Sequence, residues 1–202
     1  MGFELHDPEA LLATLRSFPK ETDWVEFKAN KFDSEAVGRY VSGLANAAMF
    51  QRQKLAYMVW GVADGTHEIV GTTVRLESET VGAEAFLLWL NKYVRPKINV
   101  HHCPFDLEGK HIEMLVIEPG YQQPVSFSGR EYIRVATSLV PLSEHVEKQR
   151  TLWQITSSYS FENSAVASHM SAEEITQKFS VAPLLRLLGA EGRTATNSLH
   201  LL

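Results

Sequence analysis

Two stretches of the chain decide its fold: ETDWVEFK at residues 21–28 and LAYMVWGVAD at residues 55–64. Over residues 24–28 the side chains alternate between two faces, which is the period that a strand imposes. The second stretch is apolar almost throughout, and its last residue, Asp64, is followed by Gly65, which is typical of a buried strand followed by a turn. If the two strands pair, they bring Glu26 and Asp64 toward neighbouring strand ends.

Further helices and strands follow from capping residues and apolar periodicity. Helices are expected to start at Asp7, Ser34, Thr80 and Ser143. Strands are expected at residues 69–71, 98–105 and 111–118, with a hairpin from 124–127 to 131–135. Helices interspersed with strand pairs indicate an α+β fold, in which a mixed β-sheet with hairpins packs against several helices. We expect residues 1–154 to form this domain and residues 155–202 to be a linker and a weakly patterned C-terminal tail.

The composition is that of an ordinary globular protein. The 202 residues are 45% hydrophobic and 10% aromatic, which is enough for one packed core. The formal net charge is -5, so contact with a nucleic acid would need a local basic patch. Cys103 is the only cysteine, which excludes an intrachain disulfide and a Cys-rich zinc site. No apolar run is long enough to span a bilayer, so we expect a cytoplasmic protein without membrane contact.

Short motifs in a fixed order give the chain a family resemblance. They are Glu21, Trp24 to Lys28, Tyr40 to Ala47, Trp60 to Gly65, Ile69 to Gly71, Arg95-Pro96, Gln123 to Val125 and Tyr132 to Val135. Each motif is weak alone, but the ordered set resembles the AlbA_2 domain of Schlafen proteins and of many bacterial regulators. The resemblance implies a DNA-binding role.

Two segments depart from the family pattern. Family members have a Gly-Gly pair soon after the Ala-Asn motif, where this chain has Met49 to Lys54. The arginine motif of the family continues into glycine, whereas here Ala136 follows Val135. We therefore do not assume a backbone contact to phosphate that depends on these glycines.

The resemblance also implies a candidate metal site. In Schlafen relatives this domain is a metal-dependent RNA endonuclease that uses three acids, and the matching residues are Glu21, Glu26 and Asp64. Carboxylates bind Mg²⁺ or Mn²⁺, and the ion activates water and offsets charge on the scissile phosphate. In the alternative interpretation, Glu21 is a loop acid, Glu26 is a solvated strand residue and Asp64 forms a turn. Mg²⁺ or Mn²⁺ is expected only if the domain is a nuclease, and no other cofactor is indicated.

Four residues are candidates for contact with nucleic acid. Lys28 would bind a phosphate or hold Glu26 in place. Tyr132 and Arg134 share one face of a strand, where a ring can stack on a base and a guanidinium can bind phosphate. Arg130 would extend the basic surface. The structural alternatives are that Lys28 is only solvated and that Arg134 forms a cross-strand pair that stabilises the hairpin.

We therefore predict a nucleic-acid-binding module of a transcriptional regulator, which contacts DNA or RNA mainly through phosphates. One alternative is a Mg²⁺- or Mn²⁺-dependent endoribonuclease of the Schlafen type. A second alternative is an interaction module without nucleic-acid activity. The expected partner is DNA or RNA, and the sequence leaves a homodimer open.

Overall fold

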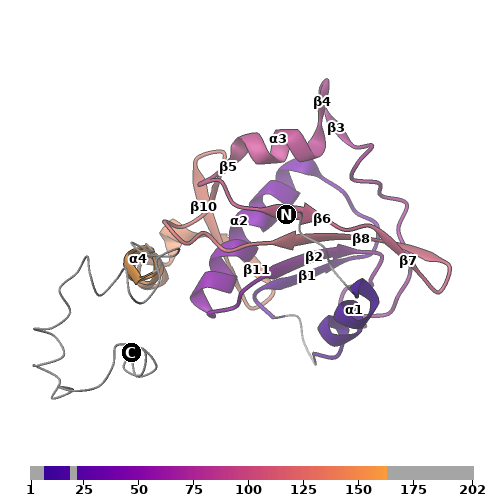
Figure 1. Cartoon of the computed structure of the whole chain (residues 1–202), viewed down its shortest axis with the longest axis horizontal. Helices are drawn as coiled ribbons and strands as arrows, with labels where there is room; N and C mark the ends of the chain where they lie inside the picture. Colours follow the sequence, from indigo (N-terminus) through magenta and orange to yellow (C-terminus); the bar gives the residue numbers. More distant parts are fainter. Residues whose placement is uncertain (1–6, 19–21, 163–202) are drawn as a thin grey trace, which may run out of the picture. The chain divides into compact units, whose positions relative to one another are not determined.

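The computed structural model describes residues 7–18 and 22–162, arranged as Figure 1 shows. The chain divides into two compact units, residues 1–161 and 162–202. The helices are α1 (Pro8–Arg16), α2 (Ser34–Phe50), α3 (Phe86–Tyr93) and α4 (Val146–Glu162), with a 3-10 turn at Leu142–Glu144. The strands are β1 (Val25–Lys28), β2 (Ala56–Trp60), β3 (Thr80–Val81), β4 (Glu84–Ala85), β5 (Val94–Arg95), β6 (Val100–His102), β7 (Phe105–Leu107), β8 (Lys110–Ile117), β9 (Ser126–Phe127), β10 (Arg130–Val135) and β11 (Ser138–Pro141).

The main sheet runs in the order β1-β2-β8-β6, and β7 also pairs with β8. Strands β1 and β2 are parallel, with Val25 opposite Tyr57 and Lys28 opposite Trp60. The other pairs of this sheet are antiparallel. The two defining stretches therefore pair with each other, and the predicted α+β class is confirmed.

The two faces of this sheet cover two different cores, because successive strand side chains point to opposite sides. One face packs on α1 through Val25, Phe27, Val59, Met114 and Val116. The other face packs on α2 and α3 through Met58, Trp60, Leu115 and Ile117. Figure 1 shows α1 and α3 on different sides of the strands.

Helix α2 joins the main sheet to a second sheet, whose order is β11-β10-β9-β5. The approach is close because α2 carries small residues: a Cβ on Gly38 would lie 2.2 Å from the Phe127 ring. Two polar residues of α2 then fix the second sheet. Ser42 Oγ donates to the Val125 carbonyl at 2.7 Å, and Asn46 Nδ2 donates to the Tyr132 carbonyl at 2.7 Å.

Several boundaries differ from the sequence prediction. Asp33, not Ser34, caps α2, since its carboxylate accepts from the Ala36 N–H. Thr80 begins the short hairpin β3–β4, and α3 starts only at Phe86. The strand expected at residues 69–71 is reduced to one bridge between Val62 and Ile69. Strand β11 was not predicted.

The predicted C-terminal tail is described only at its start. Helix α4 continues to Glu162, past residue 155, where the linker was predicted to begin. The remainder of the predicted tail, residues 163–202, lies outside the described residues. No helix in the part of the chain that the structure describes is long and apolar enough to cross a membrane.

Candidate nucleic-acid interface

A pocket of about 500 Å³ lies between the N-terminal half of α2, the end of β1, the middle of β2, and strands β10 and β11. Three of the four predicted contact residues line it, namely Lys28, Arg130 and Tyr132. Its other lining residues are Lys31, Asp33, Ala36, Val37, Arg39, Tyr40, Met58, Leu139 and Pro141. The lining thus contains four cationic side chains and one carboxylate, although the protein as a whole has a net charge of -5. Such an arrangement attracts anions locally.

Two of these cations were not predicted. Lys31 lies in the loop between β1 and α2, and Arg39 is on the exposed side of α2. The loop is held in place because the Trp60 indole N–H donates to the Lys31 carbonyl at 3.0 Å. Isolated basic residues in a loop or on a helix carry little signal in a sequence. Only the tertiary fold brings these two beside the strand residues.

Lys28 is held by its surroundings as a fixed cation. Its ammonium forms an ion pair with Glu26 and lies 5.0 Å from the centre of the Tyr40 ring. Burial favours the neutral amine, but the hydrogen bonds and charges of Glu26 and Tyr40 outweigh it and raise the pKa of Lys28. Lys28 is therefore charged at neutral pH and positioned for an anion.

Arg134 differs from the other predicted contact residues because it lies in the core. Its side chain is 0% exposed, forms an ion pair with Glu26 and donates to the Val25 carbonyl at 2.6 Å. Residue alternation correctly places Tyr132 and Arg134 on one face of β10, but β10 runs from the pocket rim into the protein. In this structure Arg134 supports the β1 strand and does not line the pocket, so we leave it out of the interface.

Two of the three candidate acids, Glu26 and Asp64, lie in the part of the chain that the structure describes. Glu21 lies outside the described residues. Glu26 is 3% exposed and is engaged by Lys28 and Arg134, while Asp64 is exposed in the turn after β2. Among the described residues, no three Asp, Glu, His or Cys side chains are grouped so that they could hold a metal ion. Because the structure does not describe Glu21, the three-acid metal site stays a prediction, and we derive no catalytic step from it.

A second polar cluster was missed by the sequence analysis. Glu113 on β8 is buried and bonds to Nε2 of both His102 and His111, the latter at 3.1 Å. His111 Nδ1 lies 2.9 Å from Asp106, and His102 Nδ1 lies 3.7 Å from Glu77. Burial raises the pKa of Glu113, but the two imidazoles outweigh it and lower the pKa below its usual value. The cluster ties β6, β7 and β8 to the segment that carries Glu77.

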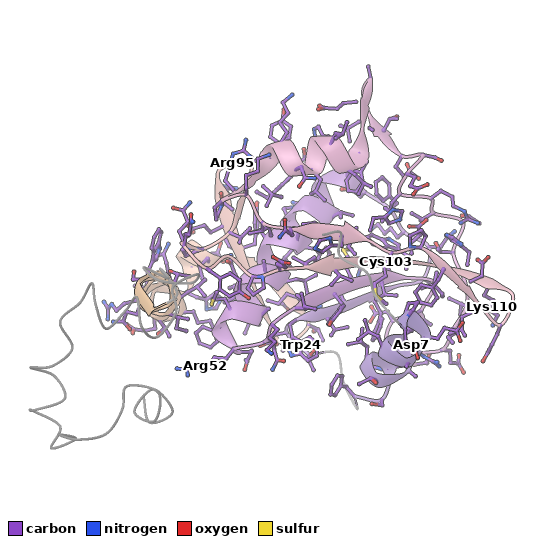
Figure 2. All side chains as sticks on the ribbon, viewed as in Figure 1. Asp7, Trp24, Arg52, Arg95, Cys103 and Lys110 are labelled. Atoms are coloured by element: carbon purple, nitrogen blue, oxygen red, sulfur yellow. The ribbon has the colours of Figure 1, made fainter. Side chains whose placement is uncertain are left out.

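The other basic residues are dispersed. Figure 2 places Arg52 beyond the C-terminal end of α2, Arg95 on β5 and Lys110 at the tip of the β7–β8 hairpin. None of the three lines the pocket. They therefore serve as a comparison set for the clustered cations.

A family model described as Schlafen, AlbA_2 matches residues 21–143, more than half of the chain. The chain belongs to this family. The match includes β1, α2, β2 and β10, which supply the pocket, so the resemblance expected from the motifs is confirmed.

Among solved structures, the AlbA_2 chain is similar to the DIP2311 protein from Corynebacterium diphtheriae, at 18% sequence identity and a TM-score of 0.43. The aligned region covers 71% of this chain and 31% of that protein, so the chain spans less than a third of its length. No match was found among curated proteins.

The two departures from the AlbA_2 pattern keep a backbone conformation that favours glycine. Arg52, within the segment that replaces the Gly-Gly pair, has a φ of 56°, and Ala136 has a φ of 55°. Left-handed φ values are uncommon for residues with a side chain. This chain therefore retains the turns and tolerates the strain of a Cβ at both places.

Proposed function

We propose that this AlbA_2 domain is the nucleic-acid-binding module of a transcriptional regulator and contacts DNA or RNA mainly through phosphates. The observation that supports the proposal is the pocket that gathers Lys28, Lys31, Arg39 and Arg130 around one concave surface. Phosphate contacts by lysine and arginine supply most of the sequence-independent affinity of such proteins. Family membership adds to this support, because AlbA_2 domains are associated with regulators.

The pocket is suited to phosphate because its charges are preorganised. Lys28 is fixed by Glu26, and Asp33 uses its carboxylate to cap α2. An incoming phosphate would therefore meet cations without first displacing a free acid. The N-terminal end of α2 lies at the same place, and its backbone dipole adds a favourable contribution to anion binding.

Fluorescence anisotropy with labelled DNA and RNA at several salt concentrations tests the proposal. If all four cations contact phosphates, the slope of log affinity against log salt is about -3 for a single strand and about -3.6 for a duplex. The double variant Lys31→Ala/Arg130→Ala should bind more weakly across sequences and reduce the magnitude of the slope by about 1.5. Both residues are exposed or at the rim, so the variant should fold.

The matched control is Lys54→Ala/Lys110→Ala, which removes the same charge outside the pocket. This variant should bind within about twofold of the unmodified protein, since a loss caused by net charge alone would affect both double variants alike. Absent binding, or binding that does not depend on salt, would instead support the interaction-module alternative.

A further inference from the structure

The pocket is lined by cationic and by apolar residues. The apolar lining residues are Ala36, Val37, Met58, Leu139 and Pro141. At about 500 Å³, its volume falls within the range of roughly 300–1,000 Å³ that encloses small ligands. A ligand that fits both parts has an anionic group next to a flat apolar body, and a single nucleotide has both.

The two tyrosines of the pocket have different surroundings. The ring of Tyr40 already lies under the Lys28 ammonium, at 5.0 Å. Tyr132 is fixed through its backbone instead, because its N–H donates to Ser42 Oγ at 3.0 Å and its carbonyl accepts from Asn46 at 2.7 Å. Its half-buried ring lines the pocket from β10. Tyr132 is therefore the aromatic side chain that is best placed to meet a base.

We propose, resting on the function proposed above, that the pocket takes one unstacked nucleotide of a single strand. Its phosphate lies at Lys28 and Arg130, and its base stacks on Tyr132. In a duplex the bases are stacked and paired, so a base enters a hollow only after it has been flipped out, at the cost of those interactions. Duplex grooves are read by elements that protrude, such as a helix or a two-stranded ribbon. A pocket lined by the Tyr132 side chain is therefore better suited to a base that is already unpaired and unstacked.

The test compares the affinity of the unmodified protein for a single strand, for a duplex of the same sequence and length, and for a mononucleotide. The single strand should bind most tightly. Tyr132→Leu should weaken binding of the single strand by about 5- to 150-fold, the usual contribution of one stacked base, while Tyr132→Phe keeps the ring and binds normally. Trp153→Leu is the control, because Trp153 is an exposed aromatic residue that does not line the pocket.

The outcomes separate this inference from the function on which it rests. Absent binding of every oligonucleotide rejects the proposed function itself. If the duplex binds as tightly as the single strand, only the inference is overturned. The inference is also overturned if a folded Tyr132→Leu variant binds normally while the Lys31→Ala/Arg130→Ala variant binds more weakly. A mononucleotide that competes as well as the strand also overturns it. If circular dichroism shows that the Tyr132→Leu variant does not fold, the inference is tested instead by comparing the affinities for single strand and duplex and by the binding of Tyr132→Phe.

Discussion

The buried ion pair between Arg134 and Glu26 allows a quantitative prediction about stability. The side chains are 0% and 3% exposed, so the Arg134→Met variant removes a cation and leaves a carboxylate in the core. Breaking a buried pair in this way costs about 3–5 kcal/mol of unfolding free energy. Lys28 still contacts Glu26, so we expect a value near the lower end, about 3 kcal/mol. For a domain of this size, the loss corresponds to a fall in Tm of about 6–12 °C.

Urea unfolding followed by tryptophan fluorescence and by circular dichroism measures this loss, and Arg130→Met is the matched control. Arg130 lies on the same strand but is exposed, so its replacement should change the unfolding free energy by less than about 0.5 kcal/mol. The double variant Glu26→Gln/Arg134→Met removes both charges, and it should be destabilised by less than the sum of the two single variants. A loss below about 1 kcal/mol for Arg134→Met, together with additive single effects, would refute the reasoning.

Three further predictions concern backbone and pH. Gly38→Ala should destabilise the protein by about 1–2 kcal/mol in urea unfolding, because the steric overlap of the new Cβ with the Phe127 ring outweighs the gain in helix propensity. An unchanged unfolding midpoint would show that the ring moves aside. Ala136→Gly should raise the unfolding free energy by about 0.5–1 kcal/mol, since it relieves a positive φ, and a lower Tm would contradict this. The pKa of Glu113 is lowered from 4.5, so its stabilising contribution is complete above that pH and is lost as the pH falls through the folded-state value. Glu113→Gln should therefore flatten the acid side of the stability curve, and an unaltered curve would exclude this carboxylate as its source.

Local sequence patterns predicted those parts of the fold that depend on local periodicity. The alternation at residues 24–28 and the apolar run at 55–62 were sufficient to predict β1 and β2, whereas their pairing was only supposed. The hairpin β3–β4 was missed because Thr80 looks like a helix cap and two-residue strands are too short to show a period. The position of β11 depends on pairing with β10, which a local pattern does not contain.

The same distinction applies to the candidate site. Lys28 and Tyr132 were named because strand periodicity and family motifs point to them, and Arg130 because it would extend the basic surface. All three line the pocket. The period gives the face of a side chain but not its depth, so it could not show that Arg134 is buried. The contacts of Glu113 with the histidines depend on the register between strands, and that register is fixed only when the sheet has formed.

Apart from Met58, the residues that line the pocket come from residues 28–40 and 130–141, with most of the domain between them in the chain. While the protein is being synthesised, α2 and Lys28 would emerge long before β10 and β11 supply the opposite wall. A nascent or prematurely terminated chain would therefore hold only half of the site. Competence to bind at this surface would arrive late, as one of the last properties that the growing domain acquires.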